Sequence, residues 1–233
     1  MKQLWSGGPY YADDPAFKIT TDSVLLANFA GKKLFTRCMD IGCGGGIISV
    51  LLHSARPDAV YDSADIREDA VRACTSNYNL NMMQGRVFCA DARMRRELGA
   101  SGSYDLVVSN PPYYYNATLR SPDPGRAAAR GDSLSPAQFS GAAGYLLKYG
   151  GRFCLVHKPE FLADIFTAMH LADIEPKRLR LVCHTADSEP SLVLIEGVRG
   201  GKPSLSVEPN LILCGSDGKP TEEIRTIYHM HTR

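Results

Sequence analysis

Short apolar runs alternate with segments of helical periodicity along most of this chain, and this alternation most constrains its fold. Short apolar or β-branched runs are typical of buried strands, whereas apolar residues three and four positions apart are typical of helices with one packed face. Alternating strands and helices predict an α/β fold whose mostly parallel sheet carries helices on both faces. We expect strands at 37–41, 60–65, 86–90, 104–109, 151–157, 178–184 and 192–198, and helices at 46–55, 68–80, 135–148 and 159–171.

The seven expected strands form a single domain that spans residues 1–233. A polar cluster at 20–23 precedes an apolar run, which predicts another helix inside an N-terminal segment, 1–35. Segment 116–134 combines three Arg, two Pro and two Gly without apolar periodicity, so we expect a long surface loop there. Residues 200–233 carry turn signals and are expected to form a C-terminal extension on the domain edge.

The composition argues against several classes of protein. The chain has 233 residues and is 44% hydrophobic, yet it has no apolar stretch long enough for a membrane helix and no apolar signal-peptide core. We therefore expect a cytoplasmic protein without a membrane partner. Its seven cysteines are odd in number and form no C-x-x-C pair, so we expect neither a disulfide framework nor a metal site.

The formal net charge of +1 is low for a protein that binds nucleic acid. The charge is uneven, however, because segments 86–96 and 118–152 each carry a balance of +3 and acidic segments elsewhere cancel them. We expect the two basic segments to lie around the functional cleft. The alternative, scattered solvated charge, remains open.

A glycine-rich turn directly follows the first expected strand, at Asp40-Ile41-Gly42-Cys43-Gly44-Gly45-Gly46. Glycines allow a sharp turn and a close approach of a ligand, and the next helix begins with free N–H groups. The spacing is D-x-G-x-G-x-G, whereas the dinucleotide fingerprint needs Gly at position 47, where Ile47 stands. An acidic strand end favours a ligand with a cationic or amino group over a pyrophosphate.

Two further carboxylates follow neighbouring strands. Asp65 ends the second expected strand, where a carboxylate can accept both hydroxyls of a ribose. Asp91 follows the third strand, where it could accept the amino hydrogens of an adenine. The alternative for each aspartate is to cap the helix that comes after it.

The fourth strand runs into Asn110-Pro111-Pro112-Tyr113. The prolines stiffen the chain and remove backbone donors, which leaves the Asn110 amide oxygen and the Pro111 carbonyl as acceptors for a planar NH₂ group. Tyr113 can stack on the ring that carries this group. The alternative is a proline turn with surface tyrosines.

Together, D-x-G-x-G-x-G and N-P-P-Y resemble the class I S-adenosylmethionine-dependent methyltransferases that modify nitrogen atoms. Further blocks resemble the bacterial tRNA1(Val) adenine N6-methyltransferase family over nearly the whole chain. They are FKITTDSVLL at 17–26, ARGD at 129–132, LVHKPE at 155–160, EPKRLR at 175–180 and GGKP at 200–203. The resemblance implies a Rossmann-like fold with a seven-stranded sheet, the cofactor S-adenosylmethionine, and a tRNA adenine in the anticodon loop as substrate.

The resemblance also implies roles for individual residues. Asn110, Pro111, Pro112 and Tyr113 would hold the target adenine, and segment 1–35 would lie over the cofactor mouth. The cofactor would contact Thr20, Asp22, Ser23, Asp40, Gly42, Gly44, Asp65, Ile66, Asp91, Ala92 and Asn110. Arg120, Arg126 and Arg130 of the loop would grip RNA phosphates around a base turned out of its stack.

Three alternatives stay open. N-P-P-Y also suits an rRNA guanine or adenine, or a protein glutamine amide. Only thirty-nine residues precede Asp40, which disfavours the glutamine enzymes because those usually carry a separate N-terminal helical domain. A cofactor-binding RNA-binding module without catalysis is the third, but it would not need Asn110 and Pro111. We expect a monomer that recognises tRNA with its own loops.

Overall fold

The computed structural model of the chain describes residues 1–12, 16–113 and 134–230. Within these residues the central sheet has the strand order β10-β8-β9-β7-β6-β3-β4-β5, and β11 also pairs with β8. Strands β3 to β7 run parallel, whereas β9 runs antiparallel to β7 and β8. The strands are β3 (Arg37–Ile41), β4 (Val60–Asp65), β5 (Val87–Cys89), β6 (Tyr104–Ser109), β7 (Leu147–His157), β8 (Ile174–Cys183), β9 (Pro190–Arg199), β10 (Ser206–Val207) and β11 (Leu211–Ile212).

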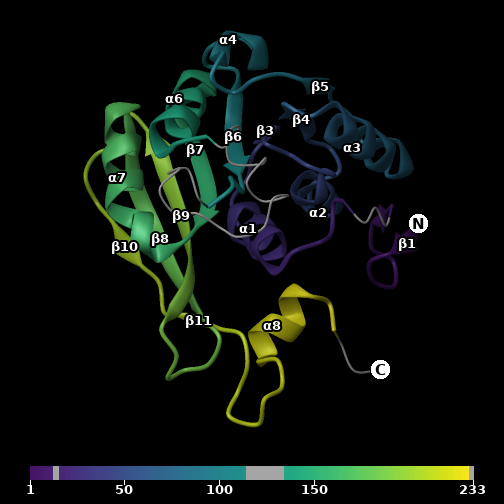
Figure 1. The fold of residues 1–233 in the computed structure, drawn as a ribbon, viewed down its shortest axis with the longest axis vertical. Helices are drawn as coiled ribbons and strands as arrows, with labels where there is room; N and C mark the ends of the chain where they lie inside the picture. The colour runs from purple at the N-terminus through teal and green to yellow at the C-terminus, as the bar shows by residue number, and fades with distance from the viewer. Residues whose placement is uncertain (13–15, 114–133, 231–233) are drawn as a thin grey trace, which may run out of the picture.

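Helices cover both faces of this sheet (Figure 1). One face packs against α1 (Thr21–Gly31), α2 (Ile47–Ala55) and α3 (Glu68–Leu80). The other face packs against α4 (Arg95–Leu98), α6 (Pro136–Leu146) and α7 (Leu162–Leu171). The chain moves outward from β3 through β4 to β5 and then returns to β6 on the other side of β3. Ligands of open α/β sheets bind at such a reversal of strand order, outside the carboxyl ends of the strands.

Local sequence signals explain where the helices begin. Thr20 caps α1 by accepting a hydrogen bond from Ser23 N, and Glu68 and Asp69 occupy the positive first turn of α3. Helix α6 begins with a complete capping box between Ser135 and Gln138. All the helices expected from the sequence are present, although 159–171 begins as a 3₁₀ turn, η1 (Pro159–Phe161), before α7.

The seven expected strands are all present, but the structure corrects the strand count. Residues of the C-terminal extension add β10 and β11, two short strands that pair in parallel with β8. Strand β7 begins at Leu147 rather than 151, because Leu147 pairs with Tyr104 of β6 across a register shift. The helix expected to reach residue 148 therefore ends at Leu146.

The two ends of the chain pack against the α1 face. An N-terminal hairpin is formed by β1 (Lys2–Gln3) and β2 (Tyr10–Tyr11), and Tyr11 is buried in the core that contains α1 and α2. The C-terminal helix α8 (Glu222–Ile227) contributes Ile224 to the same core. Among the described residues, no helix is both long and apolar enough to span a bilayer.

Candidate functional site

A cavity of about 310 Å³ opens beside the carboxyl ends of β3, β4, β5 and β6. Its wall contains five of the side chains or backbone positions predicted to contact the ligand. They are two glycines of the turn, two of the carboxylates and the amide of Asn110. The lining residues are Ile41, Gly42, Gly44, Ala64, Asp65, Ile66, Arg67, Ala90, Asp91, Ala92, Leu98, Asn110, Pro112 and Leu134. Parallel strands present their carboxyl ends at one edge, which explains why motifs from four strands meet here.

Two positions of the turn require glycine, each for a different structural reason. Gly42 has φ +73°, and the space that its missing Cβ would occupy is open, so the backbone itself forms the cavity wall. At Gly45, in contrast, a Cβ would collide with the hydroxyl of Tyr11. The N-terminal segment therefore packs directly on the glycine turn.

The two carboxylates in the wall already accept hydrogen bonds from the protein. Asp65 accepts from Gly44 N at 2.9 Å and from Arg67 N at 3.0 Å. Asp91 accepts from Arg93 N and Nε, both at 2.9 Å, and the hydrogen bond from Arg93 lowers the pKa of Asp91. A carboxylate has about four acceptor sites. Asp65 therefore keeps about two for a ligand, whereas Asp91, whose Oδ2 also lies 2.7 Å from Arg93 Nη2, keeps about one.

Asp40, also expected to contact the cofactor, is not among the residues that line this cavity. Side chains alternate along β3, and the carboxylate of Asp40 is buried on the α2 side, where it accepts a hydrogen bond from Ser49 Oγ at 3.2 Å. Its Oδ1 atom is buried without a partner. Burial raises the pKa of Asp40 to about 7. Asp40 thus lies behind the glycine turn.

The acceptor motif Asn110–Tyr113 begins directly after β6. Asn110 and Pro112 lie in the cavity wall, whereas Pro111 is buried. Asn110 Nδ2 donates a hydrogen bond to Ser23 Oγ at 3.1 Å. The ring of Tyr113 lies edge-on to His157, with ring centroids 5.2 Å apart. Because the amide nitrogen is bonded to Ser23, the amide oxygen is the atom of Asn110 left to accept a ligand's N–H group.

The first turn of α1 contacts this motif. Tyr113 OH donates a hydrogen bond to Asp22, and Ser23 Oγ lies 3.1 Å from Thr20 Oγ1. None of Thr20, Asp22 and Ser23 lines the cavity itself. Asp22 and Ser23 thus contact the acceptor motif, and Thr20 contacts Ser23.

Sequence reasoning missed other parts of the wall. Arg67 lines the cavity, and its guanidinium lies 4.8 Å from the centroid of the Phe17 ring and 3.7 Å from Asp65. Leu98 and Leu134 supply apolar surface. Arg67 could have been found because it follows Asp65 by two residues at the same strand end. Leu98 and Leu134 carried no signal beyond being apolar.

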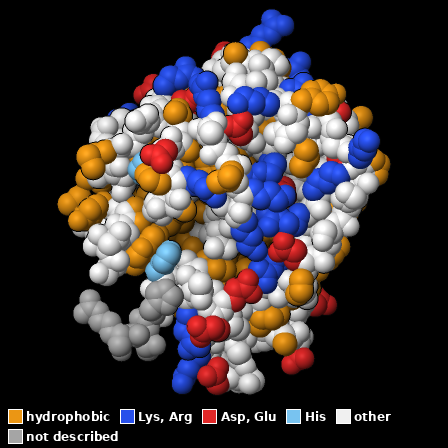
Figure 2. All heavy atoms as spheres, turned by 180° about the vertical axis from the view of Figure 1, so that it is seen from behind, with side chains coloured by type: hydrophobic (Ala, Val, Ile, Leu, Met, Phe, Trp, Pro, Cys, Tyr) orange, Lys and Arg blue, Asp and Glu red, His pale blue; other side chains and the backbone are white. Residues whose placement is uncertain are grey.

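The expectation that segments 86–96 and 118–152 place basic charge around the cleft agrees with the structure at Arg93, which lies 2.7 Å from Asp91 of the cavity wall, whereas three other basic residues of these segments pair elsewhere. Arg86 precedes β5 and lies 3.5 Å from Asp62 within β4. Lys148 pairs with Asp105 at 2.6 Å, and buried Arg152 pairs with Glu196 at 3.0 Å. Lys and Arg side chains gather near the middle of the face in Figure 2, with acidic side chains beside them. Arg120, Arg126 and Arg130 lie outside the described residues.

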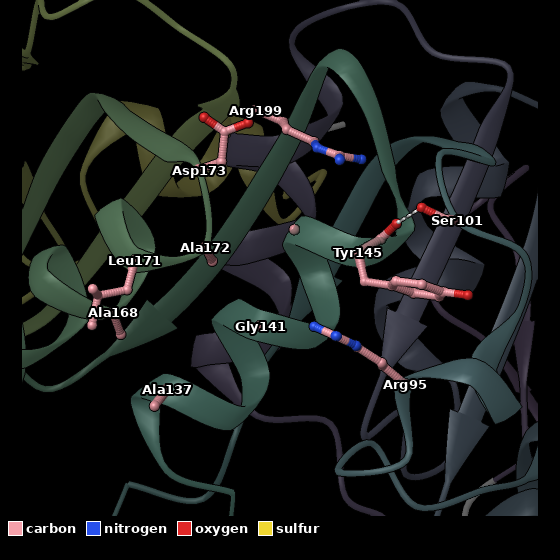
Figure 3. Close-up of a pocket in the computed structure, with 11 residues that line it drawn as sticks. Arg95, Ser101, Ala137, Gly141, Tyr145, Ala168, Leu171, Ala172, Asp173 and Arg199 are labelled. Atoms are coloured by element: carbon pink, nitrogen blue, oxygen red, sulfur yellow. Dashed lines mark hydrogen bonds between the residues drawn. The ribbon is translucent and has the colours of Figure 1, made fainter.

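A second cavity, of about 360 Å³, lies between α6 and α7 (Figure 3). Arg95 and Arg199 approach it from opposite sides, and Tyr145 and Asp173 also lie in its wall. It contains no residue of the glycine turn or of the acceptor motif. The cavity that contains the glycine turn and the acceptor motif is therefore the candidate site.

In the part of the chain that the structure describes, no group of three or more acidic, His or Cys side chains could hold a metal ion.

Comparison with known sequences gives one family and several relatives. The model of the methyltransferase small domain matches residues 18–170, which include the cavity, the glycine turn and the acceptor motif. A tRNA1(Val) (adenine(37)-N6)-methyltransferase of Parabacteroides distasonis is 31% identical over 186 residues, 79% of this chain and 78% of that protein. A protein of the same name from Shigella dysenteriae is 28% identical over 215 residues, 90% of this chain and 86% of its own length.

Comparison with solved structures supports the architecture. A predicted O-methyltransferase of Agrobacterium tumefaciens superposes with a TM-score of 0.73 and covers 90% of this chain and 96% of its own. The two sequences are 17% identical, so this likeness concerns the fold alone. It confirms the expected Rossmann-like α/β fold.

Proposed function

The chain belongs to the methyltransferase small domain family, and on that premise we propose that it transfers a methyl group from S-adenosylmethionine to the N6 amine of an adenine in tRNA. Adenine 37 of tRNA1(Val), named for its relatives, is the first candidate nucleotide. The observation that carries the proposal is Asn110, whose amide lines the cavity with its nitrogen bonded to Ser23 and its oxygen left to accept.

The residues of the cavity fit S-adenosylmethionine. Its sulfonium, amino and hydroxyl groups are cationic or hydrogen-bond donors, and the wall supplies the acceptors Asp65 and Asp91. The backbone at Gly42 and Gly44 allows close approach, and Ile41, Ala64 and Leu98 give apolar surface for a ring. We assign Gly42 and Gly44 to the methionine part of the cofactor, Asp65 and Ile66 to its ribose, and Asp91 and Ala92 to its adenine.

The acceptor motif would hold the nitrogen that receives the methyl group. Asn110 Oδ1 and the Pro111 carbonyl accept its two N–H groups, and this directs the nitrogen lone pair toward the cavity. Tyr113 supplies an aromatic surface for the base, and Pro112 stiffens the turn. When bound, the cofactor supplies an electrophilic methyl group on sulfur. The chain's contribution is therefore alignment, and the surplus proton can leave to water.

The RNA-binding surface remains a proposal. We propose that Arg120, Arg126 and Arg130 grip phosphates, as the resemblance implies. Among the described residues, exposed Arg95 and Arg96 of α4 are the basic side chains closest in sequence to Leu98 of the cavity wall. We also propose that the protein acts as a monomer.

The first test measures transfer of labelled methyl to three acceptor pools: unmodified tRNA transcripts, total rRNA and a release factor. Label in tRNA supports the proposal. Label confined to rRNA, or to the protein, contradicts it and selects one of the alternative acceptors.

A second test uses Asn110→Ala, with Asn79→Ala on the exposed surface of α3 as the matched control. Asn110→Ala should lower turnover about 100-fold or more, because it removes an acceptor aimed at the reacting amine. Asn110 also lines the cavity assigned to the cofactor, so cofactor affinity should fall, but far less than turnover, since the proposed contact of the amide oxygen is to the substrate nitrogen. Unchanged turnover would refute the role of Asn110.

A further inference from the structure

The first turn of α1, residues 20–23, makes a set of contacts that the proposed function does not use. Ser23 and Asp22 are hydrogen-bonded to Asn110 and Tyr113, the two side chains that would hold the target base. The partners in each pair are about ninety residues apart in the sequence. Neither Asp22 nor Ser23 lines the cavity. Their hydrogen bonds to the acceptor motif, rather than contact with the cavity, therefore account for their position.

We propose that the first turn of α1 is the positioning element of the acceptor motif: Ser23 fixes which way the Asn110 amide points, and Asp22 fixes the ring of Tyr113. This inference rests on the proposed function, because it assumes that Asn110 and Tyr113 hold the methyl acceptor. It assigns Ser23 and Asp22 to the substrate side of the site.

The orientation of the Asn110 amide follows from a chain of hydrogen bonds. Ser23 Oγ can accept from Asn110 Nδ2 at 3.1 Å while donating its own proton to Thr20 Oγ1, also at 3.1 Å. Thr20 Oγ1 in addition accepts from Ser23 N at 3.4 Å, which holds the threonine in place. Either hydroxyl can donate in this pair; when Ser23 donates to Thr20, the flipped amide of Asn110 would place its oxygen against the serine oxygen. The Asn110 oxygen is thereby kept free for the substrate amine.

The ring of Tyr113 is held from two sides. Its hydroxyl donates to Asp22 on α1, and its ring meets His157 at 5.2 Å from the end of β7. Lys158 Nζ lies 5.5 Å from the ring centroid. Removing the Asp22 contact would leave only ring contacts, which fix the ring less firmly than a charge-assisted hydrogen bond does.

The other end of α1 is fixed to the sheet, so the helix can hold its first turn in place. Arg178 Nη2 donates to Phe29 O at 2.7 Å, and Arg152 Nη1 donates to Ala30 O at 3.2 Å. Both arginines pair with buried Glu196, at 3.1 and 3.0 Å. Cations at a helix C-terminus satisfy its free carbonyls and its dipole. Helix α1 thus connects the sheet rigidly to the acceptor motif.

The kinetic test compares Ser23→Ala with Ser23→Thr, which keeps the hydroxyl, and with Thr21→Ala, an exposed position on the same turn. We expect Ser23→Ala to lower kcat about 10- to 100-fold, with the KM for tRNA and the cofactor affinity within about twofold of wild type. Ser23→Thr should recover most of kcat, and Thr21→Ala should match wild type. An unchanged kcat in Ser23→Ala, or a loss confined to cofactor affinity, overturns the inference.

Asp22 is tested by a double-mutant cycle with Tyr113. If Asp22 acts through the tyrosine hydroxyl, Asp22→Ala and Tyr113→Phe should each lower kcat, and the double variant should be no slower than the slower single variant. Additive losses would show that Asp22 acts elsewhere and would overturn its part of the inference.

A spectroscopic readout separates this inference from the proposed function. The NMR signal of the Asn110 side-chain NH₂ group, assigned by its loss in Asn110→Asp, should shift in Ser23→Ala and stay in place in Thr21→Ala. If the wild-type protein methylates no tRNA, the proposed function fails, and this signal still decides whether Ser23 orients the amide. An unshifted signal in Ser23→Ala overturns the inference even if tRNA is methylated.

Discussion

His157 gives a quantitative prediction about stability. This residue ends β7, is fully buried, and packs against the rings of Tyr113, Phe139 and Phe161. Among the described residues neither of its ring nitrogens has a hydrogen-bond partner. Burial lowers the pKa of His157 from 6.5 to about 4, so the folded protein holds a neutral imidazole across the usual assay range.

The sign of the pH effect follows from these two values. Between pH 6.5 and 4 the unfolded chain binds a proton at this residue and the folded chain does not. The contribution of His157 to the free energy of unfolding is therefore fully present above pH 6.5 and is lost as the pH falls toward 4. The two pKa values give a loss of about 2 kcal/mol between pH 7.5 and pH 5.

The substitution His157→Phe removes this titration and keeps an aromatic ring. Urea denaturation at pH 7.5 and pH 5 should show that the variant gains about 2 kcal/mol relative to wild type at the lower pH. A steric cost of the larger ring shifts both values equally and cancels from the comparison. His184→Gln, at an exposed position, serves as control. A difference between wild type and His157→Phe that is the same at both pH values would refute the reasoning.

Three further substitutions test other parts of the structure. Asp65→Ala should weaken binding of S-adenosylmethionine about 10-fold or more in calorimetry, and unchanged affinity would contradict the ribose assignment. The raised pKa of buried Asp40, about 7, means that its contribution to stability is lost as the pH rises from 3.8 through 7. Asp40→Asn should therefore gain about 2–3 kcal/mol relative to wild type between pH 5 and pH 8 in denaturant unfolding, and a pH-independent difference would count against this. Glu196→Gln should lose about 3–5 kcal/mol in the same assay, because buried Arg152 loses its anionic partner and Arg178 keeps only Glu208, and a loss below about 1 kcal/mol would argue against it.

The fold was predictable where each element carries its own local signal. Strand β6 contains the apolar run Leu106–Val108, and α3 begins with two acidic residues, so both are evident from the sequence. Strands β10 and β11 were not predictable, because each is a two-residue segment that becomes a strand only by pairing with β8. The start of β7 at Leu147 also depends on a partner, Tyr104, in another element.

The candidate site, like the fold, was predictable where local sequence signals decide it and not where tertiary contacts do. Asp65, Asp91 and Asn110 could be placed together because the carboxyl ends of parallel strands share one edge of a sheet. The contact between Ser23 and Asn110 depends on tertiary packing, and no spacing predicts it. Charge was the weakest guide, because the sequence counts Arg152 as basic surface while the fold buries it against Glu196.

Nucleoside analysis of a methylated tRNA is the sharpest test of methyl transfer to adenine N6. Unmodified tRNA1(Val) transcript is incubated with the protein and S-adenosylmethionine, digested, and analysed by mass spectrometry. We expect N6-methyladenosine with the wild-type protein, and we expect it to disappear with Asn110→Ala and with a transcript that has guanine at position 37. Methyl groups on another nucleoside or on protein alone, or no N6-methyladenosine with the wild-type protein, would contradict this expectation.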